Sequence, residues 1–291
     1  AVLLHCCAHN PTGVDPTEAQ WAQICEVMKA RGHIAMFDSA YQGFATGDLE
    51  VDAFALRFFV KEGVPCMLAQ SYSKNMGLYG ERVGCASAVC TSAAEAVAVQ
   101  SQLAALIRPM YSNPPRHGAA VVKRILGAAE KRGRWEVELK GMADRILEMR
   151  AQLKKLFDDM GTPGDWSHVT SQIGMFCYTG ISRAQVDYII DKHHVYMLNS
   201  GRISVAGLNP SNIEYVARLN STEGEGNVLC VSVLLQRSRD RGNQFVDRAE
   251  LSLEATDQLA PPVEQALELL FSLHDVSVSP ELSKRQVEEL A

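Results

Sequence analysis

The fold is decided by the stretch AVLLHCCAHNPTGVDPTEAQW, which runs from Ala1 to Trp21. Its first eight residues are mostly apolar and lead to the turn sequence Asn10-Pro11-Thr12-Gly13. Asp15-Pro16-Thr17-Glu18 then predicts the start of a helix, with Asp15 as the cap and Pro16 at the first helical position. The stretch therefore indicates a strand, a turn and a helix in succession.

The same alternation continues through the first third of the chain. The helix is expected to end near Gly32, and the apolar runs His33–Asp38 and Val64–Gln70 predict two further strands. The helix face expected to be buried carries Trp21, Ile24, Val27 and Met28. Continuously apolar strands separated by helices are typical of an α/β fold with a mainly parallel central sheet flanked by helices. Ligands bind such sheets beyond the carboxyl ends of the strands, where Asn10, Asp38 and Ser71–Lys74 lie.

The elements predicted after the first sheet begin with a long amphipathic helix. From Trp135 to Met160 apolar residues recur in alternating steps of four and three, which predicts the longest helix of the chain, linking two domains. A coiled coil fits the same spacing, but the glycines and proline of 161–164 end the pattern early. Strands of a smaller α+β domain are predicted at Gln172–Tyr178, His194–Leu198 and Gly201–Ala206. The predicted division is a partial large domain over 1–138, a small domain over 139–219, and a tail over 220–291 with a linker followed by helices.

Composition limits the classes of function. The chain has 291 residues, 47% of them hydrophobic and 21% charged, which suffices for a sizeable core. The net charge of -6 provides no basic surface, so we expect neither nucleic acid nor membrane as a partner. Eight cysteines without a CxxC pair indicate reduced thiols. His5 and His9 are four residues apart, but in a strand and turn rather than on a helix, so we expect no metal site.

Lys74 is the sharpest chemical feature of the sequence. It follows an apolar strand within Ser71–Arg82, and a lysine that is partly desolvated there would have a lowered pKa, as an imine-forming amine requires. Taken alone, a lysine is more often a surface residue on a loop. The neighbouring hydroxyls of Ser71 and Ser73, the nearby glycines and the anion-pairing Arg82 instead indicate a site for a phosphate-bearing cofactor.

Asp38 is the second chemical feature, because it ends the apolar run Ile34–Phe37. A carboxylate is costly in such a position unless a cation or hydrogen-bond donors meet it. A helix cap is one interpretation. The other is a buried anion that pairs with a protonated ring nitrogen, while Tyr41 offers a phenol to a neighbouring oxygen.

Six segments together resemble the fold-type I pyridoxal-phosphate aminotransferases, and within them the aspartate aminotransferase family. They are HNPTGVDPTEAQW (His9–Trp21), FDSAYQGFATGD (Phe37–Asp48), SYSKNMGLYGERVG (Ser71–Gly84), IRPMYSNPPRHGA (Ile107–Ala119), QIGMFCYTG (Gln172–Gly180) and GRISVAGL (Gly201–Leu208). The resemblance covers about residues 1–219.

The resemblance implies a role for each matching residue. Lys74 would hold pyridoxal 5'-phosphate as an imine and then carry the proton between substrate carbon and cofactor. Asp38 would keep the pyridine nitrogen protonated, and Asn10 and Tyr41 would hydrogen-bond the ring oxygen. The remaining assignments are Ser71 and Arg82 to the phosphate, Arg202 and Asn10 to the substrate α-carboxylate end, and Arg108, across a dimer interface, to the distal carboxylate.

These assignments imply a homodimeric transaminase that exchanges amino groups between small dicarboxylic amino acids and 2-oxo acids, in the mitochondrial matrix or cytoplasm. Two alternatives of the same fold stay open, an aromatic-amino-acid aminotransferase and a cofactor-dependent lyase, although Arg108 argues against the lyase. A non-catalytic chain that retains only dimerising surfaces is a third. Family members carry a phosphate loop and a ring-stacking aromatic residue before the first residue seen here, so we expect a partial chain with an unrelated tail from residue 220.

Overall fold

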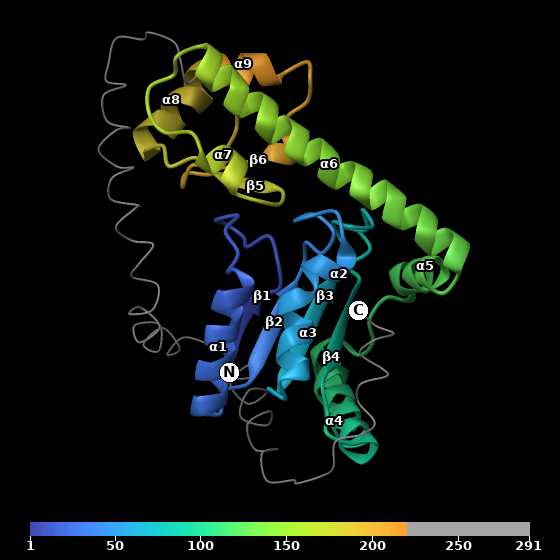
Figure 1. Ribbon diagram of the computed structural model, residues 1–291. Helices are drawn as coiled ribbons and strands as arrows, with labels where there is room; N and C mark the ends of the chain where they lie inside the picture. Colours follow the sequence, from blue (N-terminus) through green and yellow to red (C-terminus); the bar gives the residue numbers. More distant parts are fainter. Residues whose placement is uncertain (220–291) are drawn as a thin grey trace. The chain divides into compact units, whose positions relative to one another are not determined.

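The computed structural model describes residues 1–219. Its internal contacts divide these residues into two units, one containing 1–89 together with residues from 115 onward, and the other containing 90–114 (Figure 1). The domain boundaries expected near 138 and 219 stay predictions. We call residues 1–89 the sheet segment and residues 129–219 the helical segment; both belong to the first unit.

The sheet segment is built on four strands in the order β1-β2-β3-β4. They are β1 (Val2–His5), β2 (Ala35–Ser39), β3 (Cys66–Ser71) and β4 (Gly84–Ala88). β1, β2 and β3 are parallel to one another, and β4 pairs antiparallel with β3. The predicted mainly parallel sheet is therefore confirmed, with an additional strand that the sequence analysis did not identify.

Within residues 1–89, the helices pack on one face of this sheet. α1 (Glu18–Arg31) and α3 (Phe54–Lys61) pack there with Phe37, Ala35 and Cys66, and the short α2 (Leu49–Asp52) precedes α3. Successive residues of a strand point to opposite faces, so Met36 and Asp38 lie on the other face. On that face Leu3 is 62% and Met36 is 37% exposed.

The start of α1 differs from the prediction. The cap is Thr17, whose side chain accepts from the Gln20 N–H while Gln20 reaches back, a complete capping box. Asp15 is not the cap, because its carboxylate accepts the backbone N–H groups of Ala8 and His9 at 2.6 and 2.8 Å. The predicted end is confirmed by Gly32, which has φ of 61°. Val27 was expected to be buried, but it is 60% exposed.

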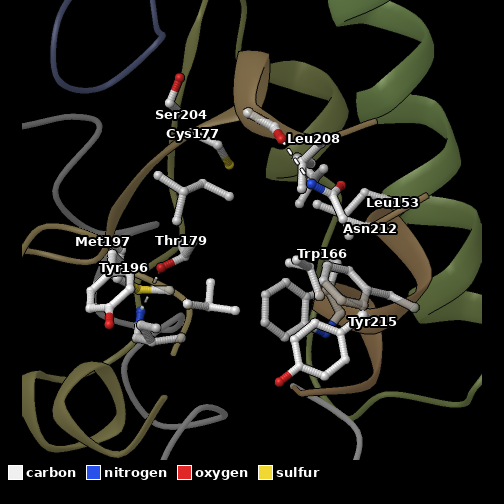
Figure 2. Close-up of a pocket in the computed structure, with 17 residues that line it drawn as sticks. Leu153, Trp166, Cys177, Thr179, Tyr196, Met197, Ser204, Leu208, Asn212 and Tyr215 are labelled. Atoms are coloured by element: carbon white, nitrogen blue, oxygen red, sulfur yellow. Dashed lines mark hydrogen bonds between the residues drawn. The ribbon is translucent and has the colours of Figure 1, made fainter. Parts of the chain in front are cut away.

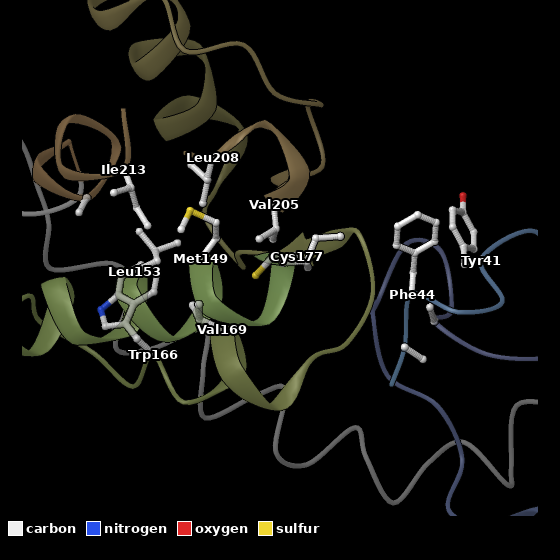
Figure 3. Packing of buried hydrophobic residues seen from close by; sticks show 14 of the residues in the cluster. Tyr41, Phe44, Met149, Leu153, Trp166, Val169, Cys177, Val205, Leu208 and Ile213 are labelled. Carbon is white, nitrogen blue, oxygen red and sulfur yellow. The ribbon is translucent and has the colours of Figure 1, made fainter. Parts of the chain in front are cut away.

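The helical segment is organised by the 31-residue helix α6 (Ala129–Asp159), which is the longest described helix, as predicted. α5 (Arg116–Leu126) precedes it, and the elements that follow are α7 (His168–Ser171), β5 (Phe176–Tyr178), α8 (Arg183–His193), β6 (Arg202–Ser204), a 3-10 turn η1 (Val205–Gly207) and α9 (Ile213–Arg218). The buried face of α6, with Met149 and Leu153, packs against Trp166, Val205 and Ile213 (Figure 3). Tyr41 and Phe44 of the sheet segment belong to the same buried cluster.

Two of the three strands predicted for this segment are confirmed as β5 and β6, which pair antiparallel. The third, at His194–Leu198, is wrong. His194 caps α8 in the left-handed conformation, and the residues after it form no ladder with a neighbouring strand in the described part of the chain. Their apolar side chains Val195 and Met197 instead pack against α8.

The second unit contains helix α4 (Ala93–Tyr111), none of whose residues is buried within the described structure. No helix among residues 1–219 combines the length and hydropathy that a bilayer crossing requires. Six of the seven described cysteines are buried. The linker and helices expected within 220–291 lie outside the described residues.

Candidate functional site

The candidate site lies at the carboxyl ends of the parallel strands, as predicted. Asn10 follows β1, Asp38 is the penultimate residue of β2, and Lys74 lies three residues after β3. The half-buried Lys74 amine is 4.9 Å from the centre of the Tyr41 ring. It forms no ion pair with any residue of 1–219.

A buried amide network holds the Lys74 loop in place. The Gln70 side chain donates to the Gln42 side chain at 2.6 Å, and the Asn75 side chain donates to the Gln42 carbonyl at 3.4 Å. On the other side the Trp135 indole donates to the Asn75 carbonyl at 2.8 Å. Because residues on both sides of Lys74 are anchored, the position of its backbone is set by the core.

Asn10 is the centre of the polar contacts in the site. Its amide nitrogen donates to the Tyr41 hydroxyl at 3.3 Å, and its amide oxygen accepts from the Arg202 guanidinium. The two residues before Asn10 are held by Asp15, whose carboxylate accepts the backbone N–H groups of residues 8 and 9. Three residues separated by up to 192 positions in sequence are thus joined directly.

Tyr41 is a buried phenol whose ionisation reflects this environment. Burial raises the pKa of the Tyr41 hydroxyl above its ordinary value, and the Asn10 hydrogen bond and the Arg202 charge act in the opposite direction. The phenol is therefore protonated at neutral pH. It can donate one hydrogen bond to an oxygen placed beside it.

Arg202 is positioned by the two-stranded sheet of the helical segment. β5 and β6 pair Tyr178 with Arg202 and Phe176 with Ser204, so these four side chains share one face. The Arg202 guanidinium lies over the Phe176 ring at 4.2 Å from its centre. One end of the guanidinium bonds to Asn10, and no other residue of 1–219 accepts from it.

The carboxylate of Asp38 is half-buried, and no described residue donates a hydrogen bond to it. Its neighbour in the sheet register is His5 of β1, on the same face. The His5 Nδ1 accepts the backbone N–H of Asn10 at 3.3 Å, which leaves the proton of the neutral ring on Nε2. The Asp38 carboxylate can therefore accept a proton donor from a ligand without breaking a protein contact.

The three remaining predicted residues are placed differently. Ser71 is half-buried at the end of β3, and its hydroxyl accepts the Ser73 N–H at 3.2 Å. Arg82 is exposed and donates to the Tyr79 carbonyl at 3.0 Å, without a contact to Ser71. Arg108 belongs to the second unit, where its side chain donates to the Ser112 hydroxyl at 2.6 Å.

A separate cavity lies within the helical segment and does not belong to this site. It has a volume of about 230 Å³ and is lined largely by apolar side chains, among them Leu153, Trp166 and Leu208. Figure 2 shows the Cys177 sulfur directed into it and the Ser204 hydroxyl directed away. The β5-β6 pair therefore separates the cavity from the face that carries Arg202.

Two positions with a direct influence on the site were not identified from the sequence. Phe176 appears in the sequence analysis only as part of a motif. A usable signal exists, because Phe176 lies two residues before Tyr178, the strand partner of Arg202, and therefore on the same face. The sequence gives no direct signal for Arg150, because the charged residues of an amphipathic helix usually face solvent. Arg150 is 1% exposed and holds three backbone carbonyls, including that of Phe176.

Comparison with known proteins agrees with this geometry. Residues 1–219 match the family model of aminotransferase class I and II. A mitochondrial aspartate aminotransferase of Dictyostelium discoideum is 54% identical over 217 residues, which is 75% of this chain and 51% of that protein. A cytoplasmic aspartate aminotransferase of rice is 56% identical over 74% of this chain and 53% of its own length. The chain thus spans about half the length of the curated relatives it matches.

Solved structures give the same result. A mitochondrial aspartate aminotransferase from Trypanosoma brucei superimposes with a TM-score of 0.73 at 50% identity, over 75% of this chain and 57% of that one. An aromatic-amino-acid aminotransferase from Burkholderia pseudomallei, covalently bound to pyridoxal phosphate, has a TM-score of 0.73 at 45% identity, over 75% of this chain and 54% of its own.

The family match and the solved structures place the chain among the aminotransferases, a class of transferases that use pyridoxal phosphate. The chain belongs to the class I and II aminotransferase family, and its curated relatives are aspartate aminotransferases. The donor set fits the cofactor, since the half-buried Lys74 has no ion pair and lies over the Tyr41 ring, and the Asp38 carboxylate at the end of β2 has no donor among the described residues.

Proposed function

We propose that this chain carries the lysine-bearing part of an aminotransferase that converts L-aspartate and 2-oxoglutarate to oxaloacetate and L-glutamate. The observation that supports it best is the continuous set of contacts from Lys74 through Tyr41 and Asn10 to Arg202. It brings an amine within reach of a carboxylate-binding guanidinium. Amino-group exchange on an amino acid needs these two groups in one site.

Each residue has a defined part in the proposed reaction. Bound pyridoxal phosphate supplies an electron-withdrawing ring that stabilises negative charge at the α-carbon of the substrate. Asp38 holds the proton on the ring nitrogen, and Asn10 and Tyr41 donate to the ring oxygen. The Lys74 Nζ removes the proton from the α-carbon and returns a proton in the second half of the exchange. Arg202 binds the α-carboxylate with the part of its guanidinium that Asn10 leaves free.

The phosphate group is assigned to Ser71 and Arg82. Arg82 would exchange its bond to the Tyr79 carbonyl for phosphate oxygens, and a charge-assisted bond of this kind is stronger than the one it replaces. The distal carboxylate of aspartate is assigned to Arg108 of a second copy of the chain. In support, α4 has no buried residues and exposes Val97, Met110 and Tyr111, each by more than half.

Two parts of the proposal concern the whole protein. Homodimerisation is proposed from the exposed apolar side chains of α4 and is tested by sedimentation of the purified chain. The proposed location is the mitochondrial matrix or the cytoplasm. Relatives are described as mitochondrial, cytoplasmic and chloroplastic, so fractionation of the source cells decides between them.

The deciding experiment is attachment of the cofactor to Lys74. The purified chain is mixed with pyridoxal phosphate, and its visible spectrum is recorded. We expect an absorption band that Lys74→Ala removes and that Lys61→Ala, a matched change at an exposed lysine of α3, retains. Borohydride reduction and peptide mass spectrometry then locate the cofactor. A chain without a band, or with one that survives Lys74→Ala, supports the non-catalytic alternative.

Substrate choice is tested by amino transfer from aspartate, alanine and phenylalanine to 2-oxoglutarate. The aspartate assignment predicts that Arg108→Ala reduces kcat/KM for aspartate much more than for alanine, because only aspartate has a second carboxylate. An aromatic-amino-acid aminotransferase is the second candidate, favoured by the similarity to the Burkholderia enzyme. It predicts rapid turnover of phenylalanine by the unsubstituted chain.

A further inference from the structure

Phe176 is in contact with two residues of the proposed site and has so far no role in it. The Arg202 guanidinium carbon lies 4.2 Å from the centre of its ring. The Tyr41 ring meets it edge to face, with centres 5.8 Å apart and planes at 84°. Tyr41 in turn lies 4.9 Å below the Lys74 amine. Two cations are therefore separated by two aromatic rings in contact.

The register of β5 and β6 produces this arrangement. Phe176 pairs with Ser204, and Arg202 pairs with Tyr178, so Phe176 and Arg202 are diagonal neighbours on one face. Diagonal pairs in an antiparallel sheet lie about 7–8 Å apart at the backbone, within reach of an aromatic ring and a long side chain. The stack is a product of strand pairing and not of a flexible loop.

The Phe176 backbone is itself fixed from the core. Its carbonyl accepts from Arg150 at 2.5 Å, and Arg150 also holds the carbonyl of Gly174 at 2.9 Å. Arg150 is almost completely buried in α6. The ring that supports Arg202 is thus anchored to the longest described helix rather than to the strand alone.

We propose that Phe176 is a positioning residue that holds the Arg202 guanidinium in the orientation in which it binds a substrate carboxylate. The inference deepens the proposed function and rests on it for the assignment of Arg202. The ring covers one flat face of the guanidinium, and Asn10 accepts from one of its ends. The uncovered N–H groups then point in a defined direction, which a planar carboxylate matches with two parallel hydrogen bonds.

Pre-orientation has a measurable effect on affinity. A guanidinium that is held before binding loses less side-chain freedom when the carboxylate arrives. Guanidinium–aromatic stacking of this kind changes an equilibrium by about 2- to 30-fold, depending on how far the pair is desolvated. We expect the loss of the Phe176 ring to weaken carboxylate binding by a factor in this range.

The test uses the complete chain, with succinate as the probe. Phe176→Leu removes the ring face while retaining an apolar side chain, and Phe176→Tyr retains the ring. Phe58→Leu is the matched control, because Phe58 is a partly buried phenylalanine that stacks on Phe54 in the sheet segment. Succinate dissociation constants are measured by calorimetry for all four proteins, with and without pyridoxal phosphate.

A second measurement reads the position of the Arg202 guanidinium directly, without a ligand. The ring current of an aromatic side chain shifts the NMR signals of protons above the ring upfield. The Arg202 side-chain N–H signals should therefore be shifted upfield in the unsubstituted chain. They are assigned by their loss in Arg202→Lys. The shift should disappear in Phe176→Leu and remain in Phe176→Tyr.

We expect succinate to bind the Phe176→Leu chain about 2- to 30-fold more weakly, and the other two variants as tightly as the unsubstituted chain. Equal affinity in Phe176→Leu, equal weakening in Phe58→Leu, an unshifted Arg202 signal, or no succinate binding by the unsubstituted chain would each overturn the proposal. The visible band formed with pyridoxal phosphate reports separately on Lys74, so failure of the proposed function is distinguishable from failure of this inference.

Discussion

Replacement of Arg150 by leucine tests whether the buried guanidinium is what holds residues 169–176 to α6. Arg150 is 1% exposed and donates to the carbonyls of Val169, Gly174 and Phe176 at 2.8, 2.9 and 2.5 Å. None of these partners is a carboxylate. Burial lowers the pKa of the Arg150 guanidinium, which shows that its charge is held at a desolvation cost.

The magnitude follows from what Arg150→Leu leaves behind. Each buried carbonyl that loses its donor costs about 1–3 kcal/mol, so three together cost about 3–9 kcal/mol. Removal of a buried charge returns several kcal/mol of desolvation. We therefore expect a net loss of about 3 kcal/mol in the free energy of unfolding, a large part of the roughly 5–15 kcal/mol that a folded protein has.

The assay is urea unfolding followed by tryptophan fluorescence, since Trp166 belongs to the buried cluster of the helical segment. Arg145→Leu is the matched control. Arg145 lies on the same helix and donates to the carbonyls of Leu208 and Ala206, but it is exposed, so water replaces the lost donors and we expect less than about 1 kcal/mol. Equal losses for the two variants would refute the assignment of a special role to Arg150.

Two further predictions concern the backbone and pH. Gly174 and Gly180 have φ of 79° and 78°, but an added Cβ would lie 2.5 Å from the Ala8 Cβ only at Gly174. Gly180→Ala should therefore cost about 1–2 kcal/mol of backbone strain, and Gly174→Ala clearly more, by the same urea assay; equal costs would contradict this. Burial lowers the pKa of His168, so the unfolded chain binds its proton more readily and stability should fall as pH drops below about 6.5 through the lowered pKa. His168→Gln should flatten this decline in unfolding free energy, whereas His33→Gln, at an exposed position, should not.

The parallel strands and the position of Lys74 after β3 could be predicted because each is encoded locally. β2 and β3 are short apolar runs, and Lys74 follows the second of them. β4 was not predicted because its sequence GCASA has no apolar run and its pairing with β3 defines it as a strand. Gly84 is required there, since a Cβ would lie 2.5 Å from the Gln70 carbonyl oxygen. Such an approach depends on a second strand and leaves no periodic signal.

The corrections have the same physical origin. Asp15 has the sequence position of a helix cap, but its carboxylate instead accepts the backbone N–H groups of Ala8 and His9. Arg150 falls on the buried side of α6, four residues after Ile146 and three before Leu153, so helical periodicity alone places it inside. A charged side chain is rarely buried, and Arg150 is buried here because three backbone carbonyls accept hydrogen bonds from its guanidinium. Long-range polar partners are the information that local patterns lack.

The exposure of the sheet face that carries Asp38 bears differently on cofactor attachment and on amino transfer. Asp38 shares that face with Leu3 and Met36, which are 62% and 37% exposed, although parallel sheets are usually covered on both faces. Where water reaches a carboxylate, its attraction for a ring-nitrogen proton is screened, by about fourfold between an effective dielectric constant of 20 and that of bulk water. Attachment at Lys74 does not depend on that attraction, whereas proton removal from the α-carbon does. The cofactor-binding and amino-transfer assays therefore measure different properties: the first reports on Lys74, and the second reports on Lys74 and Asp38 together.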